Sequence, residues 1–301
     1  MSKDKQILIT GGTGFIGTYL GERLMRDGHY LTIITRSPDK YNEESSKNQR
    51  YISWESDLVS EMEKTDIVIN LAGENLFGRW NDTVKKKIYD SRIQATRKIV
   101  EAIRKSESKP ELLISASGVS IYGDHGDSVI DESTPAADNF LGNVCTDWEA
   151  EARKATDYGV RVAVPRFGPV LEDGGGLVEI MRLPFAFFIG GPVGSGHQYI
   201  PWIHMQDLCN AVLYPVENKN LSGAYNACSP EPKTMEEFTA SFGRVMNRPS
   251  FFKVPEFALK LVLGEGAGPA LESLRVQPKV LQNSGFEFQF EDLEYALADI
   301  F

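Results

Sequence analysis

The chain of 301 residues carries 32 Lys and Arg against 42 Asp and Glu, a formal net charge of −10 at pH 7. This acidic balance argues against a general affinity for nucleic acid or for an anionic membrane surface. The length is sufficient to bury a large core and fits one large α/β domain with a smaller appendage.

We expect no signal sequence, because the charged residues 3–5 lead straight into an apolar run. The nearest approach to a membrane span, 183–191, is far shorter than the roughly 18 residues required. Cys145, Cys209 and Cys228 lack the spacing of metal sites. The sequence therefore predicts reduced thiols, no metal and a cytoplasmic protein.

A glycine-rich turn follows the first predicted strand. Gln6–Thr10 is an apolar run typical of a buried parallel strand, and Gly11, Gly14 and Gly17 come directly after it. Behind the turn, apolar residues recur at i, i+4 and i+8 and predict a helix that ends at Gly28. Missing side chains let a pyrophosphate approach backbone N–H groups at the positive helix end. This order predicts a dinucleotide-binding site rather than a glycine-rich hairpin or linker.

Strands and helices alternate through the first half. Further strands are predicted at 31–35, 66–71, 112–115 and 160–165, and the clearest helices at 81–105 and 144–156. A mobile surface loop is expected at 41–50, and one late strand at 286–290. The alternation predicts an α/β fold with a doubly wound parallel sheet, a Rossmann fold with right-handed crossovers. We expect a cofactor-binding domain over 1–170 and a smaller substrate-side region over 171–301, with 205–228 returning to the first domain.

The end of the second strand indicates which nicotinamide cofactor is preferred. An acidic residue there binds a free ribose 2′-hydroxyl, whereas a basic one pairs with a 2′-phosphate. Here Thr35, Arg36 and Ser37 follow the strand, with no carboxylate before Asp39. The planar guanidinium suits phosphate, and the two hydroxyls add donors. The sequence therefore favours NADP(H) over NAD(H), unless Arg36 is a solvated surface charge.

A second arginine lies within an apolar stripe of the helix predicted at 81–105. Arg92 shares the face of Ile88 and Ile99 at about 100° per residue. A buried arginine is costly unless an anion pairs with it. Two partners stay open, a carboxylate of the core and a phosphate of the cofactor. Lys87, at the edge of the stripe, is a weaker candidate for the same contact.

Small residues follow another strand end. Asn70-Leu71-Ala72-Gly73 stands at the end of the strand predicted at 66–71, where small residues permit close approach to the cofactor. By the same topological argument Asp57 faces the adenine.

The spacing of the three glycines, GxxGxxG, resembles the start of the extended short-chain dehydrogenases, which include sugar-nucleotide epimerases and dehydratases. That family carries Tyr and Lys four residues apart on a helix, and a Ser or Thr that binds the substrate oxygen. No Tyr of this chain has Lys four residues later. The expected frame places Leu141 and Cys145 at the pair, and Gly118 at the Ser/Thr position with Ser117 beside it. A frame shifted by one turn places Cys145 and Glu149 there instead.

Several motifs together resemble one atypical branch, known as the epimerase family protein, which ends in a C-terminal domain of unknown function. They are the glycine turn 10–17, Asn70–Glu74, Arg79-Trp80, Ser91-Arg92, Trp148-Glu149, 190–198 and Trp202–His204. The branch itself lacks the Tyr/Lys pair. Membership implies NADP(H) contacts at Thr35, Arg36, Leu71, Ala72, Lys87, Arg92 and Val170. With the glycine turn, the predicted cofactor-binding residues are Gly11, Thr13, Gly14, Phe15, Ile16, Thr35, Arg36, Leu71, Ala72, Gly73, Lys87, Arg92 and Val170.

The substrate-side candidates follow the glycine-rich segment 190–198. His204 is a candidate proton donor or a turn anchor, Trp202 a stacking platform or a core residue, and Asp207 a helix cap. We expect Glu74, Gln198 and His204 to converge over the nicotinamide.

The catalytic candidates are Glu74, Cys145, Glu149 and His204. Two functions stay open. One is an NADP(H)-dependent oxidoreductase or isomerase, epimerase-like, acting on a small polar molecule such as a nucleotide-linked sugar. The alternative is a non-catalytic NADP(H)-binding protein that senses redox state or presents an interaction surface.

Overall fold

The computed structural model describes residues 4–301, apart from the side chains of residues 42–44. One parallel sheet forms the centre of the fold, with strand order β12-β8-β5-β4-β1-β2-β3 and the short β6 beside β8. Its strands are β1 Gln6–Thr10, β2 Tyr30–Thr35, β3 Gln49–Ser53, β4 Ile67–Asn70, β5 Leu112–Ser115, β6 Ser117–Gly118, β8 Arg161–Phe167 and β12 Gly223–Ala227. The chain adds β2 and β3 on one side of β1 and then β4, β5 and β8 on the other, so the sheet is doubly wound, as predicted.

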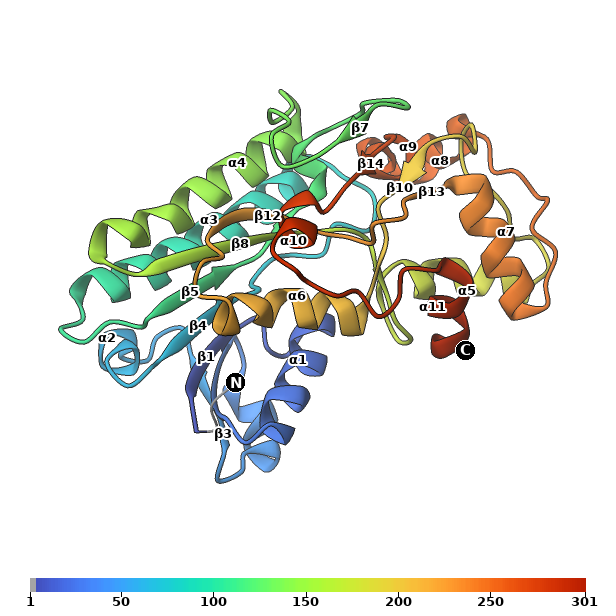
Figure 1. Cartoon of the computed structure of the whole chain (residues 1–301). Helices are drawn as coiled ribbons and strands as arrows, with labels where there is room; N and C mark the ends of the chain where they lie inside the picture. Colours follow the sequence, from blue (N-terminus) through green and yellow to red (C-terminus); the bar gives the residue numbers. More distant parts are fainter. Residues whose placement is uncertain (1–3) are drawn as a thin grey trace.

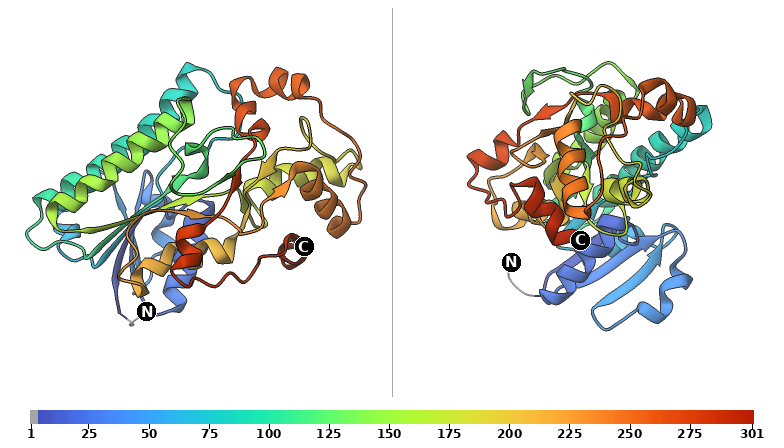
Figure 2. Two further views of the ribbon diagram at one scale, coloured as in Figure 1. Left: turned by 45° about the horizontal axis from the view of Figure 1, so that its top comes forward. Right: turned by 90° about the vertical axis from the view of Figure 1, so that its right-hand side faces the viewer.

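Helices cover both faces of this sheet (Figure 1). They are α1 Phe15–Arg26, α2 Leu58–Met62, α3 Asp82–Lys105, α4 Phe140–Arg153 and α6 Met205–Glu217. Because side chains alternate along a strand, Ile7 and Ile9 pack in the core with α1 and α6, while Leu8 packs in the core with α2, α3 and α4. Figure 2 shows α3 and α4 side by side along one face.

A second, smaller core lies at one end of the molecule (Figure 1). It is built mainly from α5 Gly176–Ala186, α7 Met235–Met246 and α11 Leu293–Ile300. Short elements join it to the main sheet: β7 Val129–Ile130 pairs with β14 Arg275–Val276, β9 Val170–Leu171 with β11 Ile203–His204, and β10 Tyr199–Ile200 with β13 Lys233–Thr234. The remaining helices are α8 Glu256–Leu263, α9 Gly268–Leu271 and α10 Lys279–Asn283, with 3₁₀ helices η1 Pro38–Glu44, η2 Val119–Ile121, η3 Lys154–Tyr158 and η4 Glu265–Ala267.

Two predictions about local structure are wrong. The expected loop 41–50 holds the end of η1 and the start of β3, which pairs in parallel with β2. No residue of β3 is fully buried, so the strand lacks the apolar run by which sequence reasoning finds one. The late strand expected at 286–290 is irregular chain. Its backbone N–H groups at Gln289 and Phe290 donate to the buried carboxylate of Asp207 instead of to a neighbouring strand.

Candidate cofactor-binding site

The glycine turn lies at the carboxyl end of β1, and α1 begins behind it. Gly11 has φ +70°, a left-handed conformation that favours glycine. Gly14 is the N-cap of α1, no side chain caps this end, and its first turn holds no acidic residue. No acidic side chain of its own first turn therefore neutralises the positive end of α1, which suits the pyrophosphate of a dinucleotide.

The glycine spacing is also required by the protein's own packing. A Cβ atom on Gly11 would lie 2.6 Å from the carbonyl oxygen of Leu71, in the loop after β4. A Cβ atom on Gly17 would lie 2.3 Å from the carbonyl oxygen of Gly11. Both distances are far below ordinary contact. A Cβ atom on Gly14 would meet only the carbonyl oxygen of Gly11, at 3.2 Å, so the small size of this residue mainly leaves room for a ligand at the turn.

A buried hydrogen-bond network fixes the loop after β4. The Thr10 hydroxyl donates to Asn70 Oδ1 at 2.6 Å, and Asn70 Nδ2 donates to Thr96 Oγ1 at 2.8 Å and to Ser115 Oγ at 3.0 Å. The same Thr10 oxygen accepts the backbone N–H of Ala72 at 3.2 Å. Sequence reasoning missed this network, although three of its polar residues stand at the ends of apolar strands.

Arg36 emerges at the carboxyl end of β2 and extends into solvent. Its side chain is 87 % exposed, and Nη1 lies 3.9 Å from Oε2 of Glu74, whose side chain is 42 % exposed. Thr35 beside it is buried, and its Oγ1 accepts the backbone N–H of Ser37 at 3.4 Å. The guanidinium is therefore a solvent-exposed cation at the carboxyl end of β2, with one long contact to a carboxylate.

Arg92 is buried, with 9 % of its surface exposed, and forms no ion pair within the described part of the chain. Its Nη1 donates to the carbonyl oxygen of Ile88 at 2.9 Å and its Nη2 to that of Glu74 at 3.1 Å. A Cβ atom on Gly73 would lie 3.1 Å from the guanidinium carbon, so the glycine makes room for it. Burial lowers the pKa of Arg92, while the charge of Glu74 opposes this. Of the two partners that the sequence leaves open, no carboxylate of the described residues forms an ion pair with Arg92.

The other residues predicted to contact the cofactor come from several elements. Phe15 packs against the start of α5, where a Cβ atom on Gly175 would meet its ring at 2.4 Å. Val170 lies in β9 and is buried. Lys87 is exposed on α3. Asp57 caps α2 by accepting the N–H and hydroxyl of Ser60.

The positions of the family's catalytic residues are apolar. Leu141 is buried with Trp80, Ile88 and Val144. Cys145 Sγ lies 3.9 Å from the position a Cβ on Gly118 would take. Burial raises the pKa of the Cys145 thiol to about 11, and the charge of Glu149 adds to this, so the thiol stays protonated at neutral pH. Neither residue supplies a proton-transferring pair.

Glu149 is held in a buried ion-pair network and is 1 % exposed. Arg166 binds it in bidentate fashion, Nε to Oε1 at 2.7 Å and Nη2 to Oε2 at 2.9 Å. Ser117 Oγ donates at 2.9 Å, and Arg153 Nη2 donates at 2.6 Å. Burial lowers the pKa of Arg166, but the hydrogen bonds and charge of Glu149 outweigh it, and the pKa is raised. The carboxylate is saturated with donors, which suits a structural ion pair and not a general base.

The expected convergence of Glu74, Gln198 and His204 does not hold, because each side chain is held by a different part of the molecule. Glu74 pairs with Arg36. Gln198 uses its whole amide inside the C-terminal region: Oε1 accepts from Ser195 and Gly196, and Nε2 donates to the carbonyl oxygens of Val193 and Ala270. The amide of Gln198 thus holds the glycine-rich segment 190–198 through hydrogen bonds.

His204 is buried and caps α6, with Nδ1 accepting the N–H of Gln206 at 3.2 Å. Its ring stacks on Phe290 at 3.8 Å between centroids. Nε2 lies 3.4 Å from Oδ2 of Asp299, outside hydrogen-bonding geometry. Burial lowers the pKa of His204 to about 4, against the opposing charge of Asp299, so the imidazole is neutral at pH 7.

Trp202 is a fully buried core residue whose Nε1 donates to the carbonyl oxygen of Glu231. The prediction that Asp207 caps the following helix is wrong, because α6 already begins at Met205 with His204 as its cap. The Asp207 carboxylate accepts the N–H groups of Gln289 and Phe290 instead.

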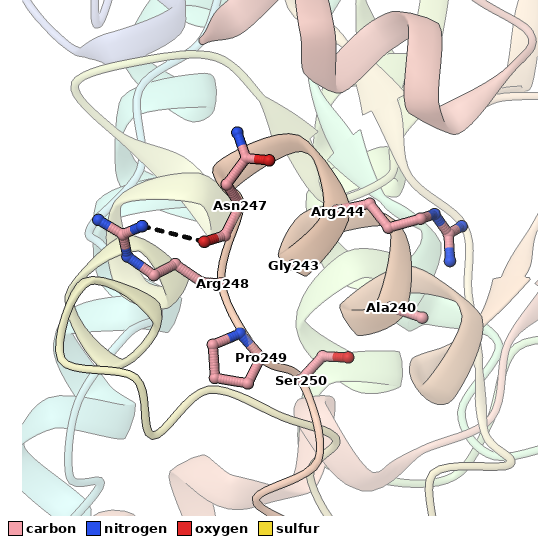
Figure 3. A pocket seen from close by; sticks show the side chains of 7 residues that line it. All are labelled: Ala240, Gly243, Arg244, Asn247, Arg248, Pro249 and Ser250. Atoms are coloured by element: carbon pink, nitrogen blue, oxygen red, sulfur yellow. Dashed lines mark hydrogen bonds between the residues drawn. The ribbon is translucent and has the colours of Figure 1, made fainter.

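A shallow depression lies away from all these residues, at the C-terminal end of α7 (Figure 3). Its lining comprises Ala240, Gly243, Arg244, Asn247, Arg248, Pro249 and Ser250. Arg248 donates to the carbonyl oxygen of Asn247 and stacks over Phe188. Within residues 4–301 no helix is long and apolar enough to cross a membrane, and no cluster of three or more His, Cys, Asp or Glu is arranged to hold a metal ion.

The sheet, the glycine turn and the cations around it define a nucleotide-binding protein of the Rossmann type. Residues 7–166 match the model of the NAD dependent epimerase/dehydratase family, and residues 254–300 match a domain of unknown function, DUF1731. The chain belongs to this epimerase/dehydratase family and has its NAD(P)-binding fold.

Named relatives agree with this assignment. Epimerase family protein YfhF of Bacillus subtilis is 39 % identical, over 98 % of this chain and 97 % of the relative. The crystal structure of human epimerase family protein SDR39U1 (isoform 2) with NADPH is 35 % identical, covers 98 % of both chains and superposes with a TM-score of 0.90. The UDP-glucuronic acid 4-epimerase of Bacillus cereus, in complex with UDP-glucuronic acid and NAD, is 15 % identical with a TM-score of 0.79, over 98 % of this chain and 97 % of that one, and shares the fold.

Proposed function

We propose that this protein binds NADP(H) in preference to NAD(H). The observation that carries the proposal is the exposed guanidinium of Arg36 at the carboxyl end of β2, where the adenosine ribose of a Rossmann cofactor lies. Arg92, buried without an ion-pair partner among the described residues, supports it as a second phosphate contact. The human relative that superposes so closely was crystallised with NADPH.

The test is a pair of dissociation constants for NADPH and NADH, measured by calorimetry. One charge-assisted contact is worth about 1.5–3 kcal/mol, so NADPH should bind roughly ten- to hundredfold more tightly. Arg36→Ala should remove most of that preference and leave NADH binding nearly unchanged. Equal constants in the wild type, or an unchanged preference in the variant, would refute the proposal.

We further propose that the protein is an NADP(H)-binding sensor or interaction module and not an epimerase of the ordinary mechanism. Leu141 and Cys145, at the positions of the missing pair, are buried and cannot exchange a proton with a substrate at neutral pH. The three polar side chains expected over the nicotinamide are all engaged elsewhere. Cofactor binding without turnover is the function that these features support.

One observation favours a second candidate, an NADP(H)-dependent oxidoreductase acting on a small polar substrate. Glu272 reaches Asn139 at the N-terminus of α4, with Nδ2 and Oε1 3.4 Å apart, and its Oε2 is buried without a hydrogen-bond partner. Burial raises the pKa of Glu272, and the charge of Asp124 adds to this. A carboxyl group of this kind is a candidate acid in place of the missing tyrosine.

NADPH oxidation at 340 nm, followed with a panel of small carbonyl compounds and UDP-sugars, decides between the two candidates. Turnover that is lost in Glu272→Gln, with NADPH affinity retained, would support the oxidoreductase. Absence of turnover with every compound, together with different affinities for NADPH and NADP⁺, would support the sensor.

A further inference from the structure

The ion pair between Arg36 and Glu74 crosses the glycine turn. In the sheet, β1 lies between β2 and β4 (Figure 1 labels β1 and β4). Arg36 follows the end of β2, and Glu74 stands four residues beyond the end of β4. The contact between Nη1 and Oε2, 3.9 Å long, therefore spans the carboxyl end of β1, where Gly11 begins the turn.

The two partners are held very differently. The backbone of Glu74 is fixed to α3, because its N–H donates to Ser91 Oγ at 2.9 Å and its carbonyl oxygen accepts from Arg92 Nη2 at 3.1 Å. Arg36 stands almost entirely in solvent, and within the described residues Glu74 is its only ion-pair partner. The carboxylate is thus presented from an anchored loop, while the guanidinium can turn toward another anion.

We propose that Glu74 is a specificity-determining residue whose carboxylate occupies Arg36 until the 2′-phosphate of NADP(H) replaces it. This inference rests on the proposed preference for NADP(H). A phosphate that binds the guanidinium must break the contact between Arg36 and Glu74, and the free energy of that ion pair is lost from the free energy of binding. NAD(H) has a neutral 2′-hydroxyl, which cannot displace a carboxylate from a guanidinium. Glu74 therefore weakens the binding of NADP(H) and leaves that of NAD(H) unchanged.

The test is Glu74→Gln, which keeps the shape of the side chain and removes its charge. Exposed ion pairs are weak, so NADPH should bind about two- to fivefold more tightly to the variant, with the gain shrinking as salt is added. NADH affinity should stay the same. Because the effect acts through Arg36, it should vanish when Glu74→Gln is made in an Arg36→Ala background.

Glu101→Gln is the matched control. Glu101 is also an exposed carboxylate paired with an arginine, Arg104, but it lies near the C-terminal end of α3, whereas Glu74 contacts the middle of that helix. Its loss changes the net charge equally and should leave both affinities unchanged. The inference is overturned if Glu74→Gln leaves NADPH affinity unchanged or weakens it, if NADH gains equally, or if the gain persists without Arg36. Failure of the proposed function is distinguishable, because it appears as equal cofactor affinities in the wild type.

Discussion

Replacing Glu149 by glutamine should destabilise the protein strongly. Glu149 accepts two hydrogen bonds from Arg166, one from Ser117 and one from Arg153. Glutamine keeps the size of the side chain, but it places an amide donor against arginine donors and leaves Arg166, which is buried, without its counter-charge. Removing one partner of a buried ion pair costs about 3–5 kcal/mol. Whole domains are stable by only about 5–15 kcal/mol, so this is a large fraction.

Thermal and urea unfolding followed by circular dichroism measure the effect. At roughly 2–4 °C per kcal/mol for domains of comparable size, the expected fall in Tm is roughly 6–20 °C. Arg153→Ala is the control, because it removes only the half-exposed partner on the next turn of α4 and should cost about 0.5 kcal/mol or less. A double variant, Glu149→Gln with Arg166→Met, should recover part of the loss because no uncompensated charge stays buried.

The refuting result is a Glu149→Gln protein whose Tm lies within about 2 °C of the wild type. If such a protein had also lost a measured enzymatic activity while still binding NADPH, Glu149 would be the acid/base group that the frame shifted by one turn suggested. A structural ion pair and a catalytic carboxylate are thus separated by one variant.

Three further outcomes are expected. Burial lowers the pKa of His204 from 6.5 to about 4 in the folded state, so its contribution to stability, up to about 3 kcal/mol, is complete above pH 6.5 and is lost as the pH falls toward 4. His204→Asn keeps a helix-capping acceptor and should make the free energy of urea unfolding less dependent on pH between 6.5 and 4. An unchanged pH dependence in this variant would contradict the burial argument. Gly17→Ala should lower the free energy of unfolding by about 1–3 kcal/mol and weaken NADPH binding more than tenfold, because the added Cβ atom meets the Gly11 carbonyl oxygen. The control is Gly268→Ala, which should be neutral or slightly stabilising because Gly268 is helical and a Cβ atom there meets nothing within 4 Å. Equal effects of the two variants in a urea titration would show that packing at the glycine turn does not limit stability. Conversion of UDP-glucose to UDP-galactose should be absent or very weak, because roughly 10²–10⁴-fold of acid/base assistance is missing, and robust turnover in a coupled assay would disprove this.

Local pattern was sufficient for the cofactor half of the fold. The apolar run of β1, the glycine spacing and the stripe on α1 each follow from short-range sequence, and together they predict a parallel sheet with a dinucleotide turn. The sequence does not predict β3, because a strand in which no residue is fully buried does not need an apolar run, and β3 has none. The extended segment at 286–290 was mistaken for a strand because alternating phenylalanines have the period of a strand wherever they are buried.

The roles of the side chains in the candidate site depend on their partners in the tertiary structure. Sequence alone placed Arg36 at the end of β2, and it showed that no Tyr/Lys pair exists, because both facts concern residues near one another in the chain. It could not show that Arg166 binds Glu149, that Phe290 stacks on His204 or that the Asp207 carboxylate accepts the N–H of Gln289. These partners lie 17 to 86 residues apart in the chain. Whether a carboxylate or an imidazole is a free acid/base or a structural element is decided by such distant partners and by burial, and only the tertiary structure supplies them.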